Sequence, residues 1–158
     1  MDNVQPDRGK AVRTVIGTAT IVITLGWIAA TAGQERPALE AFSHYEQIRV
    51  ALSAETLAET AKHAKALAPL VGAVVGNAAK KAADQLAAAK TLEDARAYFG
   101  DLSVLLVPKF QAEGIPGAHA YMCPMKQKPW IQRGDTMSNP YFGKAMANCG
   151  SPLAPQAK

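Results

Sequence analysis

The sulfur-containing side chains of this sequence are concentrated in one region. Both cysteines and four of the five methionines lie between residues 115 and 150, whereas residues 37–113 contain neither type. Methionines that only fill core gaps would be expected among the helices of the protein. Thiolate and thioether groups prefer Cu(I) to hard cations such as Mg²⁺ and Ca²⁺. The region therefore indicates a site for a soft metal ion.

Two short sulfur pairs stand near the ends of this region. Cys123 and Met125 are separated by Pro124, which restricts the chain between them. Met146 and Cys149 are three residues apart, a spacing that places two side chains on one side of a helix. If the two pairs meet in the folded chain, they supply three or four soft ligands to one ion.

The same region carries a specific series of motifs. C-P-M at 123–125 is followed by Trp130, by N-P-Y-F-G at 139–143 and by M-x-x-C-G at 146–150. This series resembles a family of small exported helical domains of unknown function. Members of that family occur alone and at the C-terminus of periplasmic adaptors of copper/silver efflux pumps. The resemblance covers about residues 38–150 and is specific only in its C-terminal signature.

The resemblance implies both a function and a ligand set. It implies a periplasmic protein that binds Cu(I) and acts as a carrier or accessory in heavy-metal efflux, with a pump adaptor as a partner. The implied ligands are Cys123, Met125, Met146 and Cys149. Family members commonly have a longer polar insert between C-P-M and the tryptophan than residues 126–129 provide here.

Four further residues are secondary candidates for the metal site. Met122 and Met137 lie outside the signature. His119 precedes Cys123 by four residues and is the best placed of the three histidines. Trp130 could contact a bound ion by a cation–π interaction, although its simpler role is an apolar anchor that packs this region onto the rest of the protein.

The two cysteines also permit a disulfide. In an exported protein, paired cysteines are most often oxidised. A Cys123–Cys149 bond would close a loop of about 26 residues and stabilise the fold by about 3 kcal/mol. The compartment favours the disulfide and the clustered methionines favour a metal, so both interpretations stay open. The alternative function is accordingly a disulfide-stapled interaction module that associates with an efflux adaptor without binding metal.

The N-terminus has the three parts of a secretory signal peptide. Basic residues at 8, 10 and 13 precede an uncharged run from Val15 to Ala30, and Ala30-Thr31-Ala32 forms a small-x-small exit. The run is short for a membrane span, which needs about 20 residues. We expect residues 1–32 to be a cleaved signal peptide, with an uncleaved anchor as the alternative. Either one places the remaining chain outside the cytoplasm, in the periplasm.

Charge and motif content argue against other functional classes. The formal charge of +4 falls to +3 once residues 1–32, with three basic and two acidic side chains, are removed. Without a basic cluster, nucleic-acid binding is not expected. No enzymatic activity is expected either, because no nucleophile–base set, paired-carboxylate motif or phosphate loop is recognisable. His44 and His63 stand singly on separate predicted helices and are interpreted as surface or boundary residues.

Hydrophobic spacing predicts the elements that position these residues. Apolar residues recur at steps of three and four through residues 37–113, in four stretches joined by short breaks. We therefore predict an all-α fold, an up-down bundle of four helices over residues 33–114. The first stripe comprises Leu39, Phe42, Tyr45, Ile48 and Leu52, and the fourth comprises Leu92, Ala95, Phe99, Leu102, Leu106 and Phe110.

Local signals set the expected helix boundaries. Thr91 and Asp94 have the spacing of a capping box, with Asp in place of the usual Glu. Pro69 and Pro108 are predicted to kink or end their helices. Residues 115–150 are rich in Pro and Gly and are expected to be an irregular segment packed on the bundle. Within it we predict a small hairpin or ordered loop over 119–132 and a two-turn helix over 140–147, followed by a loose tail over 151–158.

Overall fold

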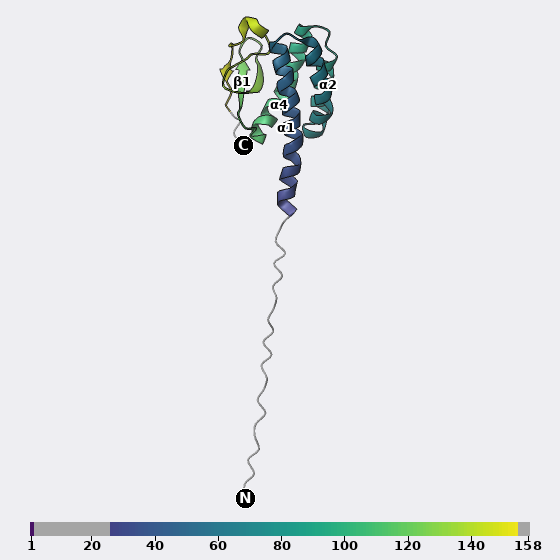
Figure 1. Ribbon diagram of the computed structural model, residues 1–158, viewed down its shortest axis with the longest axis vertical. Coiled ribbons are helices and arrows are strands. Elements are labelled where there is room, and N and C mark those ends of the chain that lie inside the picture. Colours follow the sequence, from purple (N-terminus) through teal and green to yellow (C-terminus); the bar gives the residue numbers. More distant parts are fainter. Residues whose placement is uncertain (2–25, 155–158) are drawn as a thin grey trace.

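The computed structural model describes Met1 and residues 26–154. Four helices come first: α1 (Gly26–Ser53), α2 (Leu57–Val74), α3 (Asn77–Ala87) and α4 (Leu92–Glu113). Strands β1 (Ala118–Cys123), β2 (Lys128–Arg133) and β3 (Ser151–Pro152) follow, with a 3₁₀ helix η1 (Gly143–Met146) before β3. In Figure 1 the strands lie on one side of α1 and α4, and α2 lies on the other.

The prediction of an all-α fold is wrong. The chain after the helices forms a three-stranded antiparallel sheet in the order β2-β1-β3, so the fold is mixed α/β. Its strands are only six, six and two residues long. Strands this short, flanked by prolines and glycines, show too little alternation of polar and apolar residues to be separated from an irregular segment.

The apolar faces predicted for the helices form most of the core. Buried residues from the four helices include Phe42, Tyr45, Ile48, Leu52, Leu67, Val71, Leu86, Phe99, Leu102, Leu106 and Phe110. Leu39 is an exception because it is 40% exposed. Ala38 and Ala41 are buried instead. They lie on the same face of α1 as Phe42 and Tyr45, whereas Leu39 lies off that face.

The helix ends confirm Thr91 as a cap and exclude one of the two outcomes predicted for the prolines. The Thr91 hydroxyl accepts a hydrogen bond from the Asp94 backbone N–H at 3.0 Å, the first bond of a capping box. The Asp94 carboxylate accepts from the Thr91 hydroxyl at 2.8 Å, in place of the Thr91 backbone N–H. Pro69 and Pro108 lie inside α2 and α4, which continue past them, so neither proline ends its helix.

The predicted hairpin or ordered loop over residues 119–132 is a hairpin. Two glycines with left-handed backbone angles bracket it, Gly117 with φ +69° and Gly134 with φ +81°. The Gly134 N–H donates to the Gly117 carbonyl at 3.2 Å and closes the hairpin at its open end. Residues 151–152, expected in a loose tail, pair as β3 with β1.

The two-turn helix predicted over residues 140–147 is not present. Only the four residues of η1 are helical there, and they adopt the tighter 3₁₀ form. Gly143, the first of them, has φ +57°, which is outside the right-handed helical region. The helix therefore cannot begin at Pro140, although Asn139-Pro140 has the composition of a helix start.

Tyr45 joins the bundle to the sheet. Its hydroxyl lies 2.8 Å from the Ser103 hydroxyl on α4 and accepts a hydrogen bond from the Ile131 backbone N–H of β2 at 3.4 Å. Burial raises the pKa of Tyr45 well above its ordinary value, so this hydroxyl stays protonated. The outer edge of β2 is thereby tied to both α1 and α4.

Two arginines of the bundle hold the loop that follows the hairpin. Arg49 is buried and donates to the Ser138 carbonyl at 3.2 Å. Arg96 donates to the Pro140 carbonyl at 3.2 Å and pairs with the Glu55 carboxylate at 3.0 Å. The backbone leading into the N-P-Y motif is therefore fixed by charged side chains from α1 and α4.

The predicted export segment, residues 1–32, lies mostly outside the described residues. Residues 26–32 belong to the first turns of α1, which extends beyond the other helices in Figure 1. Among the helices that the structure describes, none is both long and apolar enough to cross a membrane.

Candidate soft-metal site

The Cys123 thiol lies inside the protein at the end of β1. The residue is fully buried. Its Sγ accepts a hydrogen bond from the Asn139 side-chain amide, with Nδ2 at 3.4 Å. An N–H group aimed at a ligand atom is the arrangement by which outer residues commonly orient metal ligands.

Asn139 brings the second cysteine to the first. The same Nδ2 atom donates to the Cys149 backbone carbonyl at 2.6 Å. On the other side of its amide, Oδ1 accepts the Tyr141 backbone N–H at 2.8 Å, and the Asn139 backbone N–H donates to the Ala147 carbonyl at 2.7 Å. One buried asparagine thus holds the Cys123 thiol against the backbone of Cys149.

Both cysteines are unlinked in the structure. Cys123 is buried and Cys149 is half-buried. The Cys149 N–H donates to the Met146 carbonyl at 3.0 Å, so the M-x-x-C motif is a tight turn rather than part of an α-helix. The helical spacing expected to place the two sulfurs on one side is therefore absent, and the two residues are joined by a backbone hydrogen bond of this turn.

Trp130 packs against Gly150, the residue that follows Cys149. It is fully buried, stacks on Tyr121 at a centroid distance of 5.3 Å, and meets Tyr141 edge-on at 6.1 Å. Gly150 lies so close that an added Cβ would be 2.5 Å from the Trp130 ring. The same Cβ would be 2.9 Å from the Met137 sulfur. Trp130 acts as the predicted apolar anchor, and Met137 lies next to the residue that follows Cys149.

The remaining candidate ligands differ in exposure and in their position relative to Cys123. Met125 is on the hairpin turn and is 59% exposed, whereas Met146 is half-buried. Met122 precedes Cys123 in β1, so the alternation of a strand directs it to the opposite face of the sheet. His119 is exposed, lies 3.4 Å from Asp135, and is about 13 Å from Cys123 along the strand. Neither Met122 nor His119 is brought to the Cys123 thiol.

Tyr141 lies between the cysteine-containing segment and α4. Its hydroxyl donates to the Pro129 carbonyl at 2.6 Å, and its ring packs on Phe99 of α4 at 5.9 Å. Burial raises the pKa of Tyr141 well above its ordinary value, and the Cys123 thiol adds to that effect. Tyr141 therefore remains a neutral hydrogen-bond donor and adds no negative charge beside the cysteines.

The donors present fit a soft ion and not a hard one. Over residues 26–154, no three His, Cys, Asp or Glu side chains gather in a metal-binding group. The sulfur-bearing residues here are instead the buried Cys123, the half-buried Cys149, whose backbone carbonyl shares the Asn139 amide with the Cys123 thiol, and Met137, whose sulfur lies next to Gly150. Thiolate and thioether groups are donors suited to Cu(I) and are poor ligands for Mg²⁺ or Ca²⁺.

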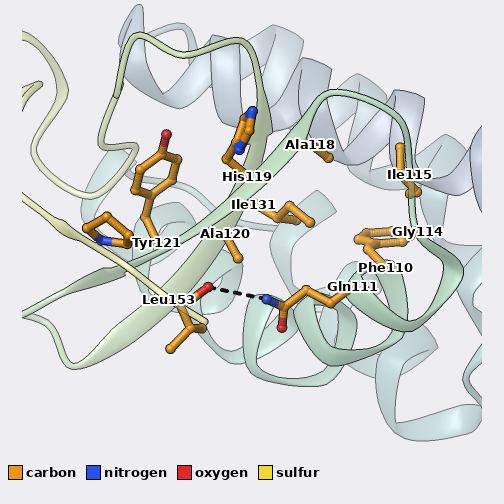
Figure 2. Close-up of a pocket in the computed structure, with 11 residues that line it drawn as sticks. Phe110, Gln111, Gly114, Ile115, Ala118, His119, Ala120, Tyr121, Ile131 and Leu153 are labelled. Carbon is orange, nitrogen blue, oxygen red and sulfur yellow. Dashed lines mark hydrogen bonds between the residues drawn. The ribbon is translucent and has the colours of Figure 1, made fainter. Parts of the chain in front are cut away.

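A cavity of about 460 Å³ lies away from the cysteines. It opens between α4 and the sheet, against Phe110, Ile115, Ala120 and Ile131. Figure 2 shows the hydrogen bond from Gln111 to the Leu153 carbonyl at its edge, at 3.4 Å. His119 and Tyr121 are the two titratable side chains among the residues that line it.

No family model, curated protein or solved structure matches this chain. The similarity of residues 123–150 to the exported efflux-associated domains therefore rests on the motifs themselves.

Asn139 is the site residue that the sequence interpretation missed. Its position before a proline indicated a helix cap, and its Oδ1 does accept the Tyr141 N–H as a capping side chain would. The other half of its amide contacts both cysteines. The signal available in the sequence was its position, an asparagine between the two cysteine motifs.

Proposed function

We propose that this chain binds Cu(I) through Cys123 and Cys149 and serves in the periplasm as a carrier or accessory of heavy-metal efflux. The observation that carries the proposal is the Asn139 side chain, whose single amide nitrogen contacts the Cys123 thiol and the Cys149 carbonyl. It keeps two unlinked cysteines in one place without a disulfide. The motif resemblance and the export segment support the compartment and the efflux role.

The three thioethers are proposed to have different roles in metal binding. Met137 contributes from the interior, because its sulfur lies beside Gly150 and Trp130. Met125 is exposed on the turn two residues after Cys123, where it can receive an ion from a donor protein and pass it inward. Met146 lies in the turn that positions Cys149.

A Cu(I) titration of reduced protein against a competing chelator tests the proposal. We expect one ion per chain and a loss of affinity of at least about a hundredfold in the Cys123→Ser/Cys149→Ser double variant. Asn139→Ala is expected to weaken binding by about tenfold, as loss of an orienting group does. Asn148→Ala is the matched control, since Asn148 is exposed and adjoins Cys149. Equal affinity in the parent and the double variant would refute the site.

Thiol counting distinguishes the alternative function. A quantitative Cys123–Cys149 disulfide that resists reduction, with unchanged binding to an efflux adaptor, would favour the stapled interaction module. Two reducible or free thiols that become protected when Cu(I) is added favour the carrier.

A further inference from the structure

Two histidines that the sequence places on separate helices meet across the bundle surface. His44 is on α1 and His63 is on α2, and their Nδ1 atoms are 3.3 Å apart. The ring centroids are 5.6 Å apart, so the two nitrogens face each other almost in line. Both rings are half-buried, which leaves one side of the pair open to water.

An acidic residue lies beside one ring. Glu59, one turn before His63 on α2, has its carboxylate 3.7 Å from His63 Nε2 and 3.2 Å from the Lys62 ammonium. A carboxylate beside one ring nitrogen favours the proton there and leaves the other nitrogen with a free lone pair. Histidine ligands of metals usually have such a partner on their outer nitrogen. With the proton of His63 on Nε2, its Nδ1 lone pair faces His44.

The spacing of the pair matches one coordination geometry. Two imidazole nitrogens bound to Zn²⁺ at 2.0–2.1 Å in a tetrahedral arrangement are about 3.3–3.4 Å apart. Adjacent nitrogens of a square-planar ion are closer, at about 2.8–2.9 Å. An ion bound to both nitrogens lies to one side of the axis that joins them. Each ring must therefore turn about χ2 until its Nδ1 lone pair points at the ion, and that torsion is broad in histidine.

We infer that His44 and His63 form a site for a borderline divalent cation, Zn²⁺, with water in its remaining positions. Glu59 is a positioning residue for His63. The ion links α1 to α2 and binds nitrogen donors. The site is therefore distinct in place and in chemistry from the cysteine segment, and it does not depend on the proposed Cu(I) function.

The test is a Zn²⁺ titration of untagged protein carrying Cys123→Ser and Cys149→Ser, so that thiols do not compete. We expect one equivalent to bind and to raise the thermal midpoint, because a ligand that binds only the folded state stabilises it. His63→Gln and His44→Ala should each weaken binding by at least about tenfold. His119→Ala is the matched control, because His119 also lies beside a carboxylate but has no second histidine.

Co²⁺ provides a second readout that does not depend on stability. Visible bands of tetrahedral Co²⁺, without thiolate charge-transfer bands, are expected in the cysteine-free protein and should disappear in His63→Gln. His63→Gln has similar bulk, and an unchanged circular dichroism spectrum would show that it folds. Equal Zn²⁺ affinity in His63→Gln and the parent would overturn the site. A parent protein that binds no Zn²⁺ would also overturn the site. The 3.3 Å contact between the two rings would then be a hydrogen bond only.

Discussion

The helices and the chain that follows them are held together by different kinds of interaction. The helical core is almost entirely apolar and consists of side chains that recur at helical spacing. The hairpin of the C-terminal part, residues 118–153, also adds apolar side chains to this core, Trp130 and Ile131 among them. The loop that follows it is held by individual polar contacts: Asn139 to the cysteines, Tyr141 to Pro129, and two arginines to backbone carbonyls. An apolar core tolerates many compositions, whereas a network of individual hydrogen bonds depends on each member.

The comparison has a functional consequence. A loop held by individual polar contacts can be altered at one residue without loss of the helices. The two parts nevertheless meet at Phe99 of α4, whose ring lies 4.9 Å from Tyr45 and 5.9 Å from Tyr141. Substitutions at the junction and on either side of it therefore test how separate the two parts are.

Phe99→Ala should have the largest effect. Phe99 is fully buried and packs against aromatic rings from both parts. Truncation of such a residue costs about 3–5 kcal/mol. Denaturant unfolding monitored by far-UV circular dichroism and by Trp130 fluorescence should show one coincident, weakened transition. Two separate transitions would mean that the parts unfold independently of this contact.

Gly150→Ala should destabilise only the C-terminal part. The new methyl group would overlap the Trp130 ring and the Met137 sulfur, both of which are packed. Overpacking of this kind costs about 1–3 kcal/mol. Trp130 fluorescence should report the loss before the helical signal does.

Gly72→Ala is the matched substitution in the bundle. Gly72 lies inside α2, where alanine gains about 1 kcal/mol in helix propensity. A 3.3 Å approach to the Lys80 Cβ offsets that gain, so the net change should be small. A comparable loss in both glycine variants would contradict the contrast between the two parts.

Asn139→Ala should release the cysteines while leaving the helices intact. The substitution removes the hydrogen bonds to the Cys123 thiol, the Cys149 carbonyl and the Tyr141 N–H. Leaving buried polar groups unpaired costs about 1–3 kcal/mol. We expect faster reaction of the Cys123 thiol with a colorimetric reagent. Asn148→Ala should react at the parental rate, and an unchanged rate in Asn139→Ala would exclude this role for the amide.

The two parts were also predictable to different degrees. The helix faces and the Thr91 cap follow from local spacing, because periodicity and capping act within a few residues. The pairing of β3 with β1 and the role of Asn139 do not, because they join distant parts of the chain. Ser151 pairs with Met122, and Asn139 contacts residues 10 and 16 positions away. The meeting of His44 and His63, 19 residues apart, likewise depends on how α1 packs on α2. Each histidine alone gave no sign of it.

Thr91→Ala should have a smaller effect, confined to the bundle. It removes the hydroxyl that accepts the Asp94 N–H at the start of α4. Loss of such a cap costs about 1 kcal/mol. Thr91→Ser keeps the hydroxyl and should restore most of the stability. The thiol reactivity of Cys123 should not change in either variant, and a rise in that reactivity would show that the start of α4 is coupled to the site.

The smallest expected effect is a pH dependence that originates at His63. Burial lowers the pKa of His63 below 6.5, and His44 and Lys62 lower it further, while Glu59 opposes them. The unfolded chain therefore binds a proton at this histidine more readily than the folded protein does. Its contribution to stability is present above pH 6.5 and is lost as the pH falls below that value. In the presence of a chelator, His63→Gln should show a smaller drop in unfolding free energy than the parent between pH 7.5 and pH 5, whereas His119→Gln should follow the parent. Parallel curves for the parent and His63→Gln would mean that the bundle surface around His44 and His63 is no more sensitive to acid than the rest of the molecule.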